Sequence, residues 1–293
     1  MVLVPAGNFL MGLDDVESEE LARACEREMG ASGHYCREAR ASALGFGFLS
    51  LEGTYGIGEH QVFVSSFEID RYEVTVADYR ACVAAGECEL TPLVTGDTRY
   101  QTDRLPMVNV TWNDARAYCH WEGKRLPTEA EWEKAARGTH GQRWPWGNHE
   151  RVDGANHGKG EDDVLITARY DPSARQAAGQ AGVIQFAPDD SDGAAYVVPP
   201  GTLRWSEGPY GTYDQAGNVA EWVADYFEAR GYQGLPRINP VRDAARGETM
   251  RVVRGGSWFR PAYLGRTYVR AAAPGDSRSP YRGFRCARDE PAD

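Results

Sequence analysis

The sequence has no apolar run near the about 18–20 residues that a membrane-spanning helix needs, so none is expected in this chain of 293 residues. It also lacks an excess of positive charge. Its 43 acidic and 32 basic residues leave a formal charge of −11, which argues against nucleic-acid and anionic-membrane partners. The opening segment MVLVPAGNFLMG has neither a basic stretch nor a long apolar one, so no signal peptide is visible.

The patterns of common catalytic and metal sites are absent too. None of the six cysteines forms C-x-x-C, and no cysteine–histidine cluster has the spacing of a zinc site. The six histidines form no H-E-x-x-H, and Ser257 in GGSWF lacks the G-x-S-x-G pattern of a nucleophile elbow. No glycine-rich phosphate loop occurs. These patterns therefore name no catalyst.

Aromatic residues, glycine and proline are plentiful. Eight Trp, 15 Tyr, 33 Gly and 16 Pro predict a loop-rich fold with an aromatic core. With no internal repeat and no long linker in view, we expect one domain over residues 1–293, with insertions at about 14–58 and 158–190. The start of the first insertion predicts a helix over about residues 16–29.

Three further helix starts share one signature, a threonine followed three residues later by an acid. Each threonine can accept from the first-turn N–H groups while the acid reaches back to the cap. The pairs are Thr75 with Asp78, Thr111 with Asp114, and Thr128 with Glu131. In the second helix, Trp112, Ala115 and Cys119 share one face, which predicts that Cys119 points into the core.

The cysteines are even in number, and two pairs are close in sequence, Cys25 with Cys36 and Cys82 with Cys88. They fit three disulfides or, alternatively, six buried thiols. Cys36 and Cys88 lie in polar segments, where burial as an apolar side chain is unfavourable, so disulfides are the better interpretation. This predicts an extracytoplasmic location, periplasmic or secreted.

Arginine is concentrated near the C-terminus. Residues 251–288 contain nine arginines, no lysine and one acid, a net charge of +8 that leaves −19 on the remaining chain. Arginine without lysine favours planar, bidentate or stacked contacts. These arginines either pair with the acids of the same domain, or several of them line a groove for an anionic or peptide-like ligand.

Several motifs, in this order and spacing, resemble one known family. They are MVLVPAGNFLMG at 1–12, FEIDRYEVTVAD at 67–78, GKRLPTEAEWE within 106–138, WPWGN at 144–148, GNVAEW within 211–222, and GGSW and GFRCAR within 251–288. The chain is identified as a member of the formylglycine-generating enzyme, or sulfatase-modifying factor, superfamily over nearly its whole length. The resemblance implies a mixed α+β fold related to C-type lectins, with little regular secondary structure. It also implies a disulfide between Cys119 and Cys286, in agreement with the inward face of Cys119.

The resemblance also places the chemistry of that family, which this chain lacks. Family enzymes oxidise a sulfatase cysteine to formylglycine with copper held by two cysteines, and soft thiolates suit Cu(I). Those cysteines follow the GGSW motif at positions that carry Arg260 and Gly265 here, and 257–273 contains no cysteine. We therefore expect no copper cofactor and no formylglycine generation.

The resemblance further implies bound calcium. Asp214, Asn218 and Glu221 surround the turn AGNVAEW with side-chain oxygens, and taken alone this pattern favours a helix start capped by Asn218 and Glu221. The family instead binds calcium at this loop, which implicates Asn218, Glu221 and the carbonyl of Val219. A second family site corresponds best to Asn156 and Asp192.

Two main functions compete. The first is a calcium-stabilised, non-catalytic module that binds a peptide or an anionic small molecule. Its groove would comprise Ser257, Trp258, Phe259, Arg260, Tyr263, Arg266, Tyr268 and Arg270. The second is a divergent oxidoreductase acting on a peptide-like substrate, because a family relative in pyoverdine maturation also lacks the copper cysteines. A buried acid beside the groove would favour the enzyme. A structural or partner-docking role is the third alternative.

Overall fold

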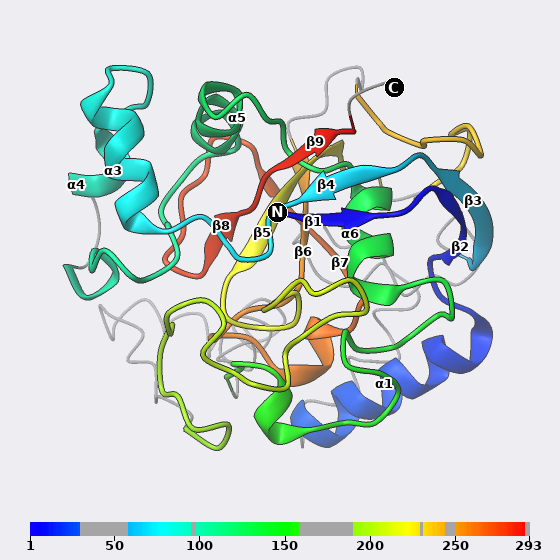
Figure 1. The fold of residues 1–293 in the computed structure, drawn as a ribbon. Coiled ribbons are helices and arrows are strands. Elements are labelled where there is room, and N and C mark those ends of the chain that lie inside the picture. The colour runs from blue at the N-terminus through cyan, green and yellow to red at the C-terminus, as the bar shows by residue number, and fades with distance from the viewer. Residues whose placement is uncertain (30–57, 95–97, 159–189, 229–230, 244–249, 291–293) are drawn as a thin grey trace, which may run out of the picture.

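The computed structural model describes residues 1–29, 58–94, 98–158, 190–228, 231–243 and 250–290. Within these ranges the strands form three small sheets joined by long loops (Figure 1). Strand β4 (Phe67–Ile69) lies between β1 (Val2–Val4) and β9 (Ala287–Asp289), antiparallel to both. Strands β2 (Gly7–Met11) and β3 (His60–Val64) form an antiparallel pair. The two ends of the described chain therefore meet in one sheet.

The largest sheet has four strands and comes from the C-terminal part of the chain. Its order is β7 (Arg270–Pro274), β6 (Met250–Arg254), β5 (Ala220–Tyr226) and β8 (Arg282–Phe284). The pairing of β5 with β8 is parallel and the other two pairings are antiparallel. This sheet carries the segment that contains most of the predicted groove residues.

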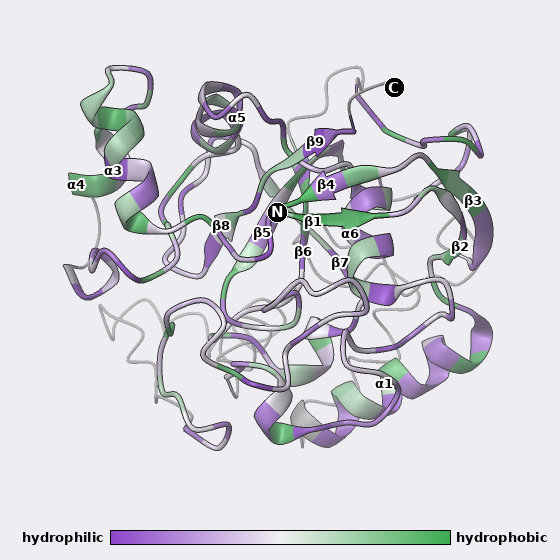
Figure 2. Cartoon of the chain, viewed as in Figure 1, coloured by the Kyte–Doolittle hydropathy of each residue, from purple (hydrophilic) through white to green (hydrophobic). Residues whose placement is uncertain are grey.

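The predicted helix starts are confirmed. Helices α3 (Val76–Ala84), α5 (Trp112–Trp121) and α6 (Glu129–Arg137) each begin with a complete capping box at the predicted threonine and acid. Helix α1 (Asp15–Met29) confirms the helix predicted at about 16–29, and hydrophilic and hydrophobic residues alternate along it (Figure 2). The short helical segments are α4 (Thr91–Val94), η2 (Thr98–Tyr100), η3 (Val152–Gly154) and η4 (Ala262–Gly265).

The two predicted insertions lie largely outside the described residues, apart from α1 and the ends of each range. Helix α1 packs on the C-terminal segment, because Leu21, Ala24 and Cys25 form one buried cluster with Leu264 and Val269. Within the described ranges, no helix combines the length and the apolar character needed to cross a membrane.

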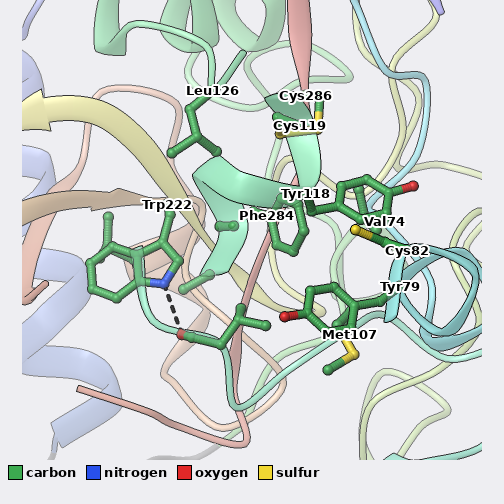
Figure 3. Packing of buried hydrophobic residues seen from close by; sticks show 14 of the residues in the cluster. Val74, Tyr79, Cys82, Met107, Tyr118, Cys119, Leu126, Trp222, Phe284 and Cys286 are labelled. Carbon is green, nitrogen blue, oxygen red and sulfur yellow. Dashed lines mark hydrogen bonds between the residues drawn. A yellow bond between two sulfur atoms is a disulfide. The ribbon is translucent and has the colours of Figure 1, made fainter. Parts of the chain in front are cut away.

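The main core lies between α3, α5 and the four-stranded sheet (Figure 3). Trp222 of β5 is fully buried and donates its indole N–H to the carbonyl of Val110 at 3.1 Å. Tyr118 of α5 packs edge-on against Phe284 of β8, with ring centroids 5.4 Å apart. Aromatic side chains thus join the helices to the sheet, as the composition predicted.

Cystine formation is confirmed for the described cysteines. Cys119 of α5 bonds to Cys286, which follows β8, and Cys82 bonds to Cys88. Cys25 is also disulfide-bonded. Its predicted partner Cys36 lies outside the described residues. The Cys119–Cys286 bond spans 167 residues and fastens the sheet to α5 within the main core.

Removal of the long-range disulfide should cost far more stability than removal of the short one. On chain-entropy grounds, a loop of this length contributes about 5 kcal/mol and a six-residue loop about 2 kcal/mol. We expect Cys119→Ala with Cys286→Ala to lower the urea midpoint about twice as much as Cys82→Ala with Cys88→Ala. Equal losses in the two double variants would show that loop closure does not set the contribution.

Candidate ligand-binding site

A cavity of about 500 Å³ lies along β6 and β7. Its walls also include residues 255–257, Arg260, Leu264 and the segment 277–282. The side chains with polar groups on these walls belong to arginine, serine and tyrosine alone. No Asp, Glu, His, Cys or Lys lines the cavity within the described part of the chain. The remaining walls are apolar, with Val253 and Ala271–Ala273 among them.

The structure divides the predicted groove residues into two groups. Ser257, Arg260 and Arg270 line the cavity. Trp258 and Phe259 instead pack in a buried cluster with Val219. Large apolar rings gain more from burial than from exposure. These two aromatics therefore serve the core at this position.

The other predicted groove residues also lie away from the cavity walls. Tyr263 and Tyr268 are buried in the cluster with α1. Arg266 donates to the Tyr268 hydroxyl at 3.1 Å and to Glu150 at 2.7 Å, so its guanidinium is committed within the fold. The aromatic stacking surface predicted from the sequence is not assembled on this cavity.

Most C-terminal arginines pair with acids of the same chain, as the first of the two alternatives stated. Arg254 donates to Glu129 at 2.8 Å and to Glu133 at 2.7 Å, and Arg270 donates to both oxygens of Glu129. Burial alone would raise the pKa of Glu129, but Arg270 and Arg254 outweigh it and hold that pKa below its ordinary value. Glu129 is therefore a permanent anion behind the cavity and a poor proton donor.

A second buried acid lies behind Glu129. Asp225 accepts from the backbone N–H groups of Glu129 and Arg242, both at 2.7 Å. Burial, with the adjacent charge of Glu129 adding to it, raises the pKa of Asp225 to about 7. Asp225 is not among the residues that line the cavity. Asp225 therefore titrates inside the fold, away from any ligand that the cavity holds.

The predicted metal residues fall into two sets with different surroundings. Asn156 is fully buried and its Oδ1 has no hydrogen-bond partner, whereas its Nδ2 donates to Asn218 at 3.1 Å. Asp192 accepts from the backbone N–H of His157, the neighbour of Asn156, at 2.6 Å. An unpartnered buried oxygen close to a carboxylate fits a calcium ion.

Glu221, which the family resemblance implicates in calcium binding, forms an ion pair with Arg285. Both of its oxygens accept from Arg285 at 2.7 Å, and Oε2 also accepts from Trp132 at 2.8 Å. A cation bound there would lie against the Arg285 guanidinium, so Asn218, Val219 and Glu221 do not fit a calcium site as they stand. The helix-cap alternative is wrong, because strand β5 begins at Ala220.

The loop at Asn218 is contacted by Glu73, a residue that no sequence motif singled out. Its carboxylate accepts from the Asn218 amide at 2.7 Å and from the Val219 N–H at 3.1 Å. Burial, reinforced by the nearby charges of Asp214 and Glu221, raises the pKa of Glu73 well above its ordinary value. Among the described residues, no three His, Cys, Asp or Glu side chains gather closely enough to hold a metal ion.

Comparison with known proteins finds a family whose domain covers nearly the whole chain. The sulfatase-modifying factor enzyme 1-like domain family matches residues 1–290. The chain belongs to the sulfatase-modifying factor family. A family member from Bos taurus, a formylglycine-generating enzyme, is 32% identical over 99% of this chain and 74% of its own length.

A second curated relative and a solved structure are also similar to this chain. A Bos taurus protein named inactive C-alpha-formylglycine-generating enzyme 2 is 36% identical, covering 62% of this chain and 50% of its own. Among solved structures, PvdO from Pseudomonas aeruginosa aligns with a TM-score of 0.67 and 25% identity, over 98% of this chain and 93% of its own. The fold expected of the family, one domain of mixed helix and sheet with much loop, is therefore confirmed.

Asp225 should make the protein less stable as the pH rises. Between the ordinary value of 3.8 and the folded value of about 7, its carboxyl is protonated in the folded protein and ionised in the unfolded chain. Its contribution to stability is therefore full at the low end of this window and lost by the high end, at up to about 1.4 kcal/mol per pH unit.

The comparison is between the parent chain and Asp225→Asn, unfolded with urea at several pH values from 4.5 to about 8. The stability of the parent relative to the variant should fall across this range and level off at its upper end. Parallel profiles for the two proteins would contradict the assignment.

Proposed function

We propose that this chain is a ligand-binding member of the sulfatase-modifying factor family that does not perform copper-dependent oxidation. The observation that carries the proposal is the make-up of the cavity, whose polar side chains are arginine, serine and tyrosine. Arg260, at a position where the family resemblance expects a copper cysteine, is one of them. A guanidinium offers hydrogen-bond donors and charge, but no ligand for copper at ordinary pH.

The state of the cysteines supports the same proposal. Cys82, Cys88, Cys119 and Cys286 are paired, and Cys25 is disulfide-bonded, so the described chain offers no free thiol. Copper(I) in the family needs two thiolates, and disulfide sulfur does not supply them. The disulfides also support an extracytoplasmic location, since such bonds persist in oxidising compartments.

The absence of a free acid supports binding over catalysis. A general acid or base must lie within hydrogen-bond reach of the reacting group. The cavity offers no carboxyl, imidazole or amine among its described walls, and Glu129, which accepts from two of the wall arginines, is held as an anion. The competing function is a divergent oxidoreductase acting on a peptide-like substrate. Such an enzyme would need a bound cofactor to supply its catalytic group.

A calcium ion at Asn156 and Asp192 is part of the proposal. The ion would take the unpartnered Oδ1 of Asn156 and the carboxylate of Asp192. It would supply no chemistry to the cavity. Its role would be to hold the segment around Asn156 to the segment around Asp192.

Copper binding tests the central claim. The parent chain should lose Cu(I) to a competing chelator and leave a cysteine-containing peptide unoxidised by mass spectrometry. The variant R260C/G265C, which restores the residue types of the family enzymes, provides the positive control. A Cβ at Gly265 meets its nearest atoms at 3.4 Å or more, so a cysteine fits there. A stoichiometric copper ion in the parent chain, or oxidation of the peptide, would contradict the proposal.

Calcium removal tests the structural site. Chelation should lower the melting temperature of the parent chain, and Asn156→Ala should abolish both the bound calcium and this response. Asn8→Ala, an exposed change on β2, is the matched control and should leave both intact. Elemental analysis that finds no calcium in the parent chain, purified without chelators, would refute this part of the proposal.

A further inference from the structure

Arg282 differs from the other buried arginines of the described chain. Four of these pair with carboxylates: Arg137 with Glu17, Arg254 with Glu129 and Glu133, Arg266 with Glu150, and Arg285 with Glu221. Arg282 is only 6% exposed, and no described Asp or Glu lies within ion-pair distance of it. A guanidinium stays charged when buried, so this positive charge is uncompensated within the fold.

The contacts of Arg282 satisfy only part of its side chain. Its Nη2 donates to the carbonyl of Ser277 at 3.0 Å and to the hydroxyl of the same residue at 2.7 Å. Its guanidinium lies 4.2 Å from the ring centroid of Trp222. Its Nε is buried and has no hydrogen-bond partner. The environment positions this cation firmly without neutralising it.

Ser257 and Arg260 line the same cavity as Arg282. Ser257 is 1% exposed and its Oγ is buried without a hydrogen-bond partner. Arg260 lies over the rings of Phe259 and Tyr281, and its charge acts on Arg282. Burial, with Arg260 adding to it, lowers the pKa of Arg282 to about 10. All three side chains line one cavity, so the charge of Arg282 and the unpartnered donors of Arg282 and Ser257 lie along the same walls.

From this arrangement we infer that the cavity binds a carboxylate on a small apolar body, and that Arg282 is the residue that recognises the carboxylate. This inference rests on the proposed binding function. Three side chains on the cavity walls have a buried donor without a partner: the Nε of Arg282, the Nε of Arg254 and the hydroxyl of Ser257. Arg254 is already neutralised by Glu129 and Glu133, so Arg282 is the guanidinium left to pair with a carboxylate, and the hydroxyl of Ser257 suits its second oxygen. The wall of Val253 and Ala271–Ala273 suits an apolar body.

The inference makes an unusual prediction for the free protein. Arg282→Met keeps the unbranched stem of the side chain and removes the guanidinium with its uncompensated charge. The variant should therefore be as stable as the parent chain or more so. Arg285→Met is the matched control, since it also replaces a buried arginine but leaves Glu221 unpaired. It should lose stability markedly. A loss in Arg282→Met as large as that in Arg285→Met would show that Arg282 is a structural residue and would overturn the inference.

Ligand binding is tested with benzoate, neutral benzamide of the same shape, and inorganic phosphate, titrated by calorimetry and thermal shift. Benzoate should bind saturably to the parent chain and raise its melting temperature. In Arg282→Met the affinity for benzoate should fall about tenfold or more. Arg282→Lys keeps the charge and should retain part of the binding. Arg288→Gln changes an arginine of β9 that pairs with Glu68 and does not line the cavity, and should leave the binding unchanged.

Each remaining outcome decides the question. Equal binding of benzamide and benzoate would show that charge is not recognised, and equal binding of phosphate would overturn the choice of a carboxylate. Benzoate binding unchanged in Arg282→Met would remove Arg282 from the site. The copper experiment separates this inference from the proposed function. Copper oxidation in a chain that still binds benzoate through Arg282 would refute the function alone, whereas a copper-free chain that ignores benzoate would refute the inference alone.

Discussion

The fold depends on the pairing of charges around α6, a helix that is buried along its whole length although it carries charged residues. Glu129 and Glu133 form ion pairs with Arg254 of β6, and Arg137 forms an ion pair with Glu17 of α1. Each pairing joins α6 to a segment more than 100 residues away in the sequence. Because an unpaired buried charge is strongly destabilising, every one of these segments must be in place for α6 to occupy the interior.

Lys134 extends this dependence to the N-terminus. Its Nζ donates to the carbonyls of Pro5, Gly7 and Val64 at 2.6–3.2 Å. Pro5 lies between β1 and β2, and Gly7 and Val64 are register partners in β2 and β3, so a single ammonium ties α6 to the start of this strand pair. The C-terminal arginines and the N-terminal strands are thus held by the same nine-residue helix, and the cavity lies on the far side of those arginines.

Local signals in the sequence predicted the parts of the fold that local physics determines. The three capping boxes and the inward face of Cys119 follow from residue spacing along a helix, and all were confirmed. The family, and with it the Cys119–Cys286 bond, came from motifs whose order no local rule explains. The pairing of Glu221 was not predictable in this way, because its partner Arg285 lies just after β8, 64 residues later in the sequence.

The candidate site shows the same limit. Trp258 ends the GGSW motif and Phe259 follows it, and both look suited to a ligand, but neighbouring segments cover them and they join the core. Arg282 was hidden among nine arginines, because the sequence does not show which of them lack an acid. In three dimensions, six of the other eight pair with acids of the described chain, whereas Arg282 is buried without one. Long-range contacts, which the sequence leaves open, decide which charged residues serve the fold and which face the cavity.

The sheet that joins the two ends of the chain has a consequence for the order of synthesis. Strand β9 completes the sheet begun by β1 and β4, and the residues just before it supply the partners of Glu221 and Cys119. Strands β1 and β4 are synthesised before residues 282–289, so until those residues emerge the sheet has an open edge at β4, and Glu221 and Cys119 lack their partners. Deletion of residues 282–289 would therefore remove one neighbour of β4, the cation that pairs with Glu221 and the thiol that bonds to Cys119.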